Sequence, residues 1–493
     1  MNQRSFIARP VAIAIMTILA GCATFDDLPP PQAKVAPATL GAREAAVQWP
    51  ADDWWRRYGD AQLDTLVADG LAGSPTLAAA QARIARADAA AGVARAALLP
   101  QVNGNGTVNE QKYSENSIYP PPLAGAWKSD ARLTLDLTFE IDFWDKNGAA
   151  LRAALSQAQA ATAEAQSARL VLAAGIARAY FDLQRLFAQR DVSRAAIVQR
   201  EEIVRITNER FGAGLDTKVE VRQAEAALAT VRTELAQYHD AIDLARHRLA
   251  ALVGAGPERG ERVAAVSPGA APAAVLPAAI PLDLVARRPE IAASRWRVEA
   301  SREDIAVAKA QFYPNVNIVA FAGLTSLGVS NLLLGSSSIA GIGPAVHLPI
   351  FEGGRLNANL KGRAAESDLA VSTYNETVID AVRELADAVT SIRGLARTTA
   401  EQARARTATD EAYNLAVVRY RAGLGNYLTV LTAQTQQLAQ ERLNVDLRAR
   451  AYELDVGLAR ALGGGYLDTT PERIAAAAGQ RRAALAPRTK DTP

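Results

Sequence analysis

A strict alternation of apolar and polar residues marks residues 132–143. The odd-numbered positions are apolar and the even-numbered ones polar or charged; the apolar set is Leu133, Leu135, Leu137, Phe139, Ile141 and Phe143. Such a period of two predicts a β-strand with one apolar and one polar face. Weaker partner segments lie at 102–108, 316–324 and 342–350. We therefore expect two pairs of strands, joined by polar loops at 110–130 and 325–338.

Most of the remaining pattern is helical. Residues 75–98 are Ala-rich and end before Pro100, residues 149–210 contain no Pro, and residues 215–253 contain neither Gly nor Pro. In the last segment two columns recur every seven residues: Val221, Leu228, Leu235, Ile242 and Leu249, with Ala224, Val231, Tyr238, Ala245 and Leu252. This heptad seam is typical of coiled-coil packing. For the helices alone, a simple antiparallel coiled coil or bundle would account for the pattern.

The chain also repeats itself. Arg210 to Leu215 read Arg-Phe-Gly-Ala-Gly-Leu, and Arg419 to Leu424 read Arg-Tyr-Arg-Ala-Gly-Leu. Leu99-Pro100 and Tyr313-Pro314 repeat at nearly the same offset. Landmarks in the same order indicate two copies of one unit: helix, strand, strand, long helix, turn, long helix. We place the first repeat at 75–254, a Gly-, Pro- and Ala-rich linker at 255–281, the second repeat at 282–464 and a flexible C-terminal tail at 465–493.

The N-terminus has the features of a secretory signal. Arg4 and Arg9 precede the apolar stretch 11–20, and Leu19-Ala20-Gly21 leads directly to Cys22. This order predicts a signal peptide at 1–21. Cys22 is the only cysteine and resembles the acylated cysteine of a bacterial lipoprotein signal, so we expect a covalent lipid on it. The alternative is a plain secreted protein. Because Ala23 follows instead of Asp, the outer membrane is the expected address.

Composition excludes several function classes. The chain has 54 Lys and Arg against 52 Asp and Glu, a net charge of +2, which argues against a nucleic-acid partner. One cysteine and three histidines provide no recognisable metal site. No phosphate-binding, dinucleotide-binding or nucleophile motif occurs. We therefore expect no enzyme activity, no metal and no cofactor other than the lipid on Cys22.

The predicted strands fit two environments. They could be soluble hairpins whose apolar faces pack on the helices, or they could cross a bilayer, for which a tilted strand needs about 9–11 residues. Trp144, directly after the alternating segment, is an aromatic residue suited to a membrane interface. Periodicity alone fits both, and the lipoprotein signal favours the membrane. Four strands cannot close a barrel, and open edges are not tolerated in hydrocarbon. Membrane-spanning strands would therefore have to be pooled by several copies of the chain.

A set of motifs in this order resembles the outer membrane factor family of TolC-like channels, in particular its lipoprotein branch of OprM/NodT type. The motifs are Trp54-Trp55 with Tyr58-Gly59-Asp60 and Leu63, Ser74-Pro75, Leu99-Pro100, Pro281-Leu282-Asp283-Leu284, Arg287-Arg288-Pro289-Glu290-Ile291, Phe312-Tyr313-Pro314 and the two Arg-containing Gly turns. The resemblance covers residues 22 to about 465.

The resemblance implies a mostly α fold with a transmembrane β-barrel. A homotrimer would form a 12-stranded barrel in the outer membrane, continuous with an α-helical barrel in the periplasm. Residues 22–74 would form an acylated segment and part of an equatorial collar. The channel would be passive and would work with an inner-membrane pump and a periplasmic adaptor, also called a membrane fusion protein. Gly212, Gly214, Gly423 and Gly425 would form the turns that contact the adaptor.

The implied function is efflux of small toxic compounds or drugs through the outer membrane. Two alternatives stay open: an exit channel for type I protein secretion, and a periplasmic coiled-coil structural lipoprotein without a pore. Selection of the substrate would occur at the pump, so the chain itself does not reveal it.

The residues that would narrow the periplasmic end depart from the family pattern. Thr429 and Thr432 stand after the second turn, where relatives often have acids, whereas Asp216 and Glu220 follow the first turn with Lys218 between them. We expect the constriction and any cation preference to depend on Asp216 and Glu220. The alternative is that these acids are solvated residues at a helix start, where the helix dipole favours them.

Overall fold

The computed structural model describes residues 28, 30–44, 47–266, 269, 276–281 and 283–468. The expected signal peptide, Cys22 and most of the expected C-terminal tail lie outside these residues. Ten elements make up the two repeats: α3 (Pro75–Ala96), β1 (Gln101–Lys112), β2 (Trp127–Ile141), α4 (Lys146–Gly212) and α5 (Lys218–Leu252), then α8 (Pro289–Ala310), β3 (Asn315–Leu327), β4 (Ser338–His347), α9 (Arg355–Arg421) and α10 (Tyr427–Ala461).

The expected order of elements in each repeat is confirmed. Equivalent helices also have equal lengths: 22 residues in α3 and α8, 67 in α4 and α9, and 35 in α5 and α10. The short elements lie mainly outside this scheme: η1 (Pro37–Leu40), η2 (Trp54–Tyr58), α2 (Ala61–Gly73), α6 (Pro257–Glu261), α7 (Leu284–Arg287), η3 (Val329–Asn331) and η4 (Gly335–Ser337). The described part of the segment predicted as a linker therefore includes the short helix α6.

Contacts divide the chain into two compact units, each assembled from both repeats. The first, here called the strand unit, comprises Arg83–Ala161, Ala293–Tyr374 and residues up to Lys34. The second, the helical unit, comprises Val35–Ala82, Thr162–Ala292 and the chain from Asn375 onward. Each unit is described by itself below.

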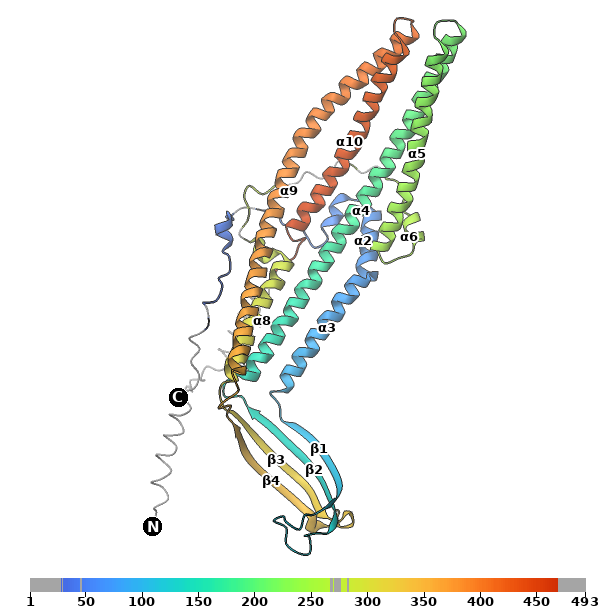
Figure 1. Ribbon diagram of the computed structural model, residues 1–493. Coiled ribbons are helices and arrows are strands. Elements are labelled where there is room, and N and C mark those ends of the chain that lie inside the picture. The colour runs from blue at the N-terminus through green and yellow to red at the C-terminus, as the bar shows by residue number, and fades with distance from the viewer. Residues whose placement is uncertain are drawn as a thin grey trace, which may run out of the picture. The chain divides into compact units, whose positions relative to one another are not determined.

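The strand unit contains one four-stranded antiparallel sheet in the order β1-β2-β3-β4 (Figure 1). Pairing of β2 with β3 joins the strand pair of one repeat to that of the other. The register puts the apolar residues in common rows, such as Val102, Leu137, Ala320 and Ile342. The alternate rows are more polar and begin with pairs such as Asn103 with Asp136 and Asn105 with Thr134. The sheet therefore has one apolar and one largely polar face.

Among the residues that the structure describes, no helix covers the apolar face of the sheet. Leu135 is 62% exposed, Ile342 80% and Val346 66%. A soluble hairpin that packed on helices would bury these side chains. The exposure therefore disfavours the soluble interpretation of the strands.

The strand boundaries differ from those expected at several ends. β1 continues to Lys112 and β2 begins at Trp127, because these two residues still pair across the hairpin. β2 ends at Ile141, before Phe143. β4 ends at His347, which pairs with Asn315, the first residue of β3 after Pro314. Ile350, expected inside the last strand, has no strand beside it and is 90% exposed.

The predicted heptad seam is the buried side of α5. Its ten positions are all buried or half-buried, and Val231 and Leu249 are almost fully buried. Polar contacts also tie the long helices of the helical unit in antiparallel pairs, seen in Figure 1 as α4 beside α5 and α9 beside α10. Arg232 of α5 pairs with Glu201 of α4 at 2.7 Å, and Arg406 of α9 pairs with Glu441 of α10 at 2.7 Å.

The Trp54 motif packs into the main core of the helical unit. Trp54 and Trp55 are buried against residues of α4, α5 and α10. Asp60 caps α2 by accepting a hydrogen bond from the backbone N–H of Gln62 at 2.9 Å, and it also accepts one from the hydroxyl of Tyr180 on α4 at 2.5 Å. These residues thus fasten the N-terminal segment onto the long helices.

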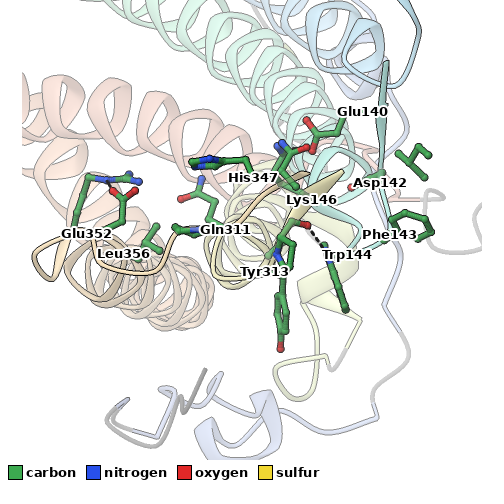
Figure 2. A pocket seen from close by; sticks show the side chains of 16 residues that line it. Glu140, Asp142, Phe143, Trp144, Lys146, Gln311, Tyr313, His347, Glu352 and Leu356 are labelled. Carbon is green, nitrogen blue, oxygen red and sulfur yellow. Dashed lines mark hydrogen bonds and ion pairs between the residues drawn. The ribbon is translucent and has the colours of Figure 1, made fainter. Parts of the chain in front are cut away.

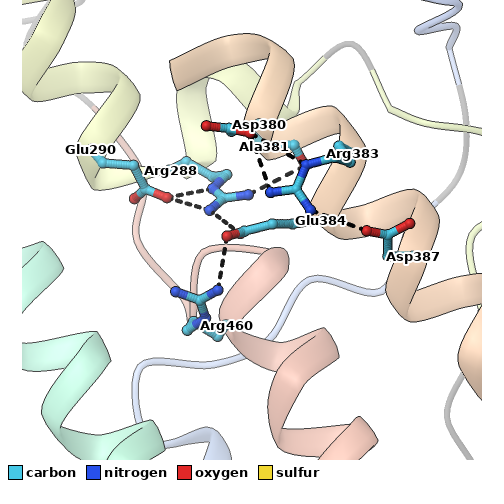
Figure 3. Close-up of polar contacts among 8 residues, drawn as sticks. All are labelled: Arg288, Glu290, Asp380, Ala381, Arg383, Glu384, Asp387 and Arg460. Carbon is cyan, nitrogen blue, oxygen red and sulfur yellow. Dashed lines mark hydrogen bonds and ion pairs between the residues drawn. The ribbon is translucent and has the colours of Figure 1, made fainter. Parts of the chain in front are cut away.

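The Arg288 motif forms an ionic cluster around a buried arginine (Figure 3). Arg288 is only 3% exposed and lies directly before α8. Its guanidinium donates to Glu290 at 2.6 Å and to Glu384 of α9 at 2.7 Å, and Arg460 of α10 donates to Glu384 at 2.9 Å. Burial opposes ionisation of Glu384, but the two arginines outweigh it and lower the pKa of this carboxyl. The cluster joins the start of α8 to α9 and α10.

Among the described residues, no helix combines the length and the apolarity that a membrane crossing requires. The same residues contain no group of His, Cys, Asp or Glu side chains arranged to hold a metal ion.

Candidate functional site at the two helical turns

The two repeated Gly turns have the same backbone design. Gly214, after α4, and Gly423, after α9, have φ values of +72° and +76°. This left-handed conformation ends a helix and costs a residue with a Cβ atom about 1–2 kcal/mol. The backbone N–H groups of Leu215 and Leu424 bond back to the carbonyls of Arg210 and Arg419 at 2.9 and 2.8 Å. Each turn is therefore a rigid helix cap.

Gly212 and Gly425, the other two predicted turn residues, differ from these. Gly212 is the last residue of α4, and a Cβ added there would have open space around it. A Cβ at Gly425 would meet Arg419 and Tyr420 at 3.5 Å, an ordinary contact. Neither has a positive φ. The backbone geometry therefore requires glycine at Gly214 and Gly423 but not at these two positions.

Asp216, one of the predicted gate acids, is held by two residues of the motifs. Arg210 at the end of α4 donates to both carboxylate oxygens, at 2.9 and 3.1 Å. The hydroxyl of Tyr420, near the end of α9, donates to the same carboxylate. Arg210 also donates to the carbonyl of Tyr420 at 2.9 Å and lies over its ring, 4.5 Å from the centroid. We call this set of three residues the turn latch.

The electrostatics of the turn latch favour the charged carboxylate. Burial alone would raise the pKa of Asp216, but hydrogen bonds from Arg210 and Tyr420 outweigh it and lower this pKa. Burial and the bond to Asp216 raise the pKa of Tyr420 to about 12. A carboxyl whose pKa falls on folding contributes its full stabilisation above its ordinary pKa of about 3.9 and loses it as the pH falls through the lowered value. The latch is therefore formed at neutral pH.

Glu220 and Lys218 belong to the start of α5. Thr217 and Glu220 form a capping box: the Val219 N–H donates to the Thr217 hydroxyl at 3.2 Å, and the Thr217 N–H donates to Glu220 at 2.8 Å. Hydrogen bonds from the Thr217 hydroxyl and from backbone N–H groups lower the pKa of Glu220. Lys218 is the first residue of α5 and is exposed. Glu220 therefore stabilises the start of its own helix, α5, whereas Asp216 contacts Arg210 and Tyr420.

Thr429 and Thr432 lie in the first turns of α10, and both are exposed. Asn426 caps this helix by accepting from the Thr429 N–H at 3.0 Å, and the Thr429 hydroxyl donates to the same oxygen at 2.8 Å. Thr432 is not part of this cap. The structure thus brings Asp216 near the second turn through Tyr420, but the two threonines take no part in the latch.

Arg210 and Tyr420 are functional candidates that the sequence analysis did not single out. Both stand inside the repeated motif, Arg210 at the first position of one copy and Tyr420 at the second position of the other. The signal was the repeat of an Arg followed by an aromatic residue before each turn. Their meeting across 210 residues required the fold.

A pocket of about 300 Å³ in the strand unit also lies beside residues that the sequence pointed to (Figure 2). Trp144 lies there after the end of β2; its indole donates to the carbonyl of Pro314 at 2.8 Å and stacks on Tyr313 at 4.6 Å. Lys146 pairs with Glu140 at 2.6 Å. These contacts hold the strand ends next to the neighbouring helix ends. We therefore assign these residues a structural role.

Comparison with known sequences decides the family. A sequence model described as "Outer membrane efflux protein" matches residues 66–255 and 280–464, which include both repeats in full. The chain belongs to the outer membrane efflux protein family. Membership in this family of transport proteins, which is not an enzyme family, places the chain in outer-membrane efflux.

Individual proteins that are similar to this chain support the same family assignment. The chain is 39% identical over 359 residues to the fusaric acid resistance protein FusA of Burkholderia cepacia, covering 71% of this chain and 67% of that one. It is 31% identical over 464 residues to the multidrug resistance outer membrane protein MdtP of Escherichia coli K12, covering 91% and 94%. Its structure is similar to that of the outer membrane protein VceC of Vibrio cholerae, with a TM-score of 0.79, 37% identity and coverage of 85% and 100%.

The family resemblance drawn from the motifs is therefore confirmed, and so is the fold class. The chain has the mostly α fold of the efflux channels, in which duplicated halves contribute to a trimeric β-barrel and a helical tunnel.

Replacing Gly423 by Ala tests the rigid turn. We expect local opening of residues 419–428 to become easier by about 1–2 kcal/mol, because alanine is strained at positive φ. Amide hydrogen exchange followed by mass spectrometry measures this as roughly tenfold faster exchange in these residues. Gly425→Ala is the matched control and should leave exchange unchanged. Equal acceleration in both variants would contradict the assignment of strain to Gly423.

Proposed function

We propose that the chain is the outer-membrane channel subunit of a tripartite efflux system. Three copies form the conduit, which is continuous from the outer membrane into the periplasm, and a periplasmic adaptor joins it to an inner-membrane pump. The chain itself is passive and catalyses no reaction, since the pump supplies the energy.

The edges and faces of the sheet carry this proposal. Within the described chain, β1 and β4 each have one unpaired edge. In hydrocarbon such edges must pair, and identical neighbours supply the partners: β4 of one copy beside β1 of the next. The exposed apolar rows then face lipid and the polar rows face water. A trimer of four-stranded sheets closes in this way into a 12-stranded barrel.

The substrates that the channel conducts are small toxic compounds. Support comes from the relatives, which are named for resistance to fusaric acid and to multiple drugs. Type I protein secretion is less well supported, because none of these names refers to a secreted protein. A structural coiled-coil lipoprotein without a pore leaves the exposed apolar sheet unexplained.

Conductance of the purified protein tests the channel. Full-length protein in mild detergent should migrate as a trimer and open pores in planar bilayers. Leu135→Asp, which puts a charge on the apolar rows, should strongly reduce the amount of trimer in the outer membrane. The matched control is Thr138→Asp, an exposed residue of the same strand on the opposite face, which should assemble and conduct. A monomeric wild-type protein without conductance would refute the proposal.

We further propose that the turn latch helps to hold the periplasmic end of the channel closed. Arg210 and Asp216 belong to the first turn and Tyr420 to the end of α9, so the latch joins two helix pairs that would have to separate on opening. Because the charge of Asp216 is paired with Arg210, this acid acts through the latch rather than as a free charge. Glu220, at a helix cap, is the acid left to influence ion preference.

Asp216→Asn should raise the open probability of single channels, because the amide cannot keep the paired charge of the latch. Glu220→Gln should instead lower the preference for cations with less effect on opening. Asp240→Asn, an exposed residue of α5 outside the turns, is the control. Unchanged gating in Asp216→Asn would show that the latch does not restrain the channel.

We propose that Cys22 carries the lipid that anchors the mature chain in the outer membrane. Mass spectrometry of the N-terminal peptide should find residue 22 as the first residue, bearing diacylglycerol and an amide-linked acyl chain. Cys22→Ser should lack both the lipid and the cleavage after residue 21. An unacylated N-terminus in the wild-type protein would disprove the anchor.

A further inference from the structure

A pocket rich in arginine lies in the helical unit among α4, α5 and α10. It has a volume of about 580 Å³ and an open mouth. Its charged lining consists of four arginines and three acids: Arg178, Arg185, Arg248, Arg450, Asp182, Asp446 and Glu453. Ala179, Phe181 and Ala449 add apolar surface. The pocket thus joins positive charge to an apolar wall.

The three acids are already engaged by two of the arginines. Arg185 pairs with Asp182 at 2.9 Å and with Asp446 at 3.4 Å, and Arg450 pairs with Glu453 at 2.6 Å. In the part of the chain that the structure describes, Arg178 and Arg248 have no carboxylate within ion-pair distance. Two guanidinium groups in this pocket therefore remain available to an anion.

The electrostatic surroundings of Arg178 also favour binding of an anion. Partial burial and the nearby positive charge of Arg460 lower the pKa of Arg178, and the carboxylates of Glu453 and Glu384 offset this only in part. A bound anion would relieve both effects, since it replaces lost hydration and offsets like-charge repulsion. A bound cation would increase the repulsion.

On α4, the pocket residues Arg178 and Asp182 lie away from the N-terminal segment and the linker. On α4, Tyr180 bonds to Asp60, and Gln184 exchanges hydrogen bonds with the backbone of Ala264 and Val266 at 3.1 and 2.8 Å. At 3.6 residues per turn, Arg178, Asp182 and Arg185 lie on roughly the opposite side of this helix. The N-terminal segment and the linker therefore cover one side of α4 and leave Arg178 and Asp182 uncovered, whereas Phe181 packs edge-on against Tyr58 of the N-terminal segment, with 4.9 Å between the ring centroids.

We propose that this pocket is a binding site for small organic carboxylates on the wall of the conduit. Arg178 and Arg248 supply the positive charge, and guanidinium groups match the planar carboxylate with two parallel hydrogen bonds. Phe181, which is only 4% exposed, and the two alanines supply the apolar lining for a ring. The assignment to the conduit wall rests on the proposed channel function, in which the collar covers the outer surface.

Benzoate binding to the purified full-length protein in detergent tests the site. Wild-type protein should bind benzoate saturably, as measured by calorimetry, and bind acetate more weakly because acetate lacks the ring. In Arg178→Gln/Arg248→Gln the benzoate dissociation constant should rise at least about tenfold. Arg83→Gln/Arg86→Gln removes the same charge from exposed residues of α3 outside the pocket and should leave binding unchanged.

A variant that is expected to bind benzoate more tightly distinguishes loss of the site from loss of folding. Glu453→Gln frees Arg450 from its carboxylate and should tighten benzoate binding. Neutral benzamide should not compete with benzoate. Absence of saturable binding, equal binding in the Arg178/Arg248 and Arg83/Arg86 double variants, or full competition by benzamide would each overturn the site. Because binding requires no open pore, a failure of conductance would count against the channel function alone.

Discussion

Two unpaired backbone edges on a four-stranded sheet are the constraint on which the architecture depends. Along the outer edges of β1 and β4, alternate residues present backbone groups that have no strand partner within the described chain. In water such an edge invites aggregation, and in lipid each unpaired group costs several kcal/mol. Copies of the same chain remove both edges when they close a ring. In the closed ring, the exposed apolar rows of the sheet face lipid.

Duplication makes this arrangement possible from one chain. Each repeat supplies one hairpin and one pair of long helices, and the equal lengths of α4 and α9 and of α5 and α10 keep the two repeats in step. The pairing of β2 with β3 then turns two hairpins into one continuous sheet. In the helical unit, Gln189 of α4 donates to the carbonyl of Arg442 on α10 at 3.0 Å, which joins the repeats there as well.

Polar clusters fix positions that the helices alone would leave ambiguous. Long Ala-rich helices can pack in several registers, because small side chains give few distinct ridges. The buried Arg288 with Glu384, Asp60 with Tyr180, and Asp216 with Arg210 and Tyr420 each fit only one arrangement. Removing one partner would leave a poorly solvated charge or polar group, which is far more costly than losing an exposed ion pair. The charged residues of the family motifs therefore act mainly as fasteners between elements.

Local patterns in the sequence determined the elements. The alternation predicted the two faces of the strands, and the heptad columns predicted the buried side of α5. The repeated turns predicted the glycines at 214 and 423. Each of these features depends only on neighbours within a few residues. Only the tertiary structure decided the pairing of β2 with β3, the early end of β4 at His347, and the meeting of Asp216 with Tyr420. It also separated Asp216, which joins two turns, from Glu220, which caps one helix, and gathered Arg178 and Arg248 into one pocket. These outcomes depend on which distant segments lie side by side, and no short-range pattern encodes that choice.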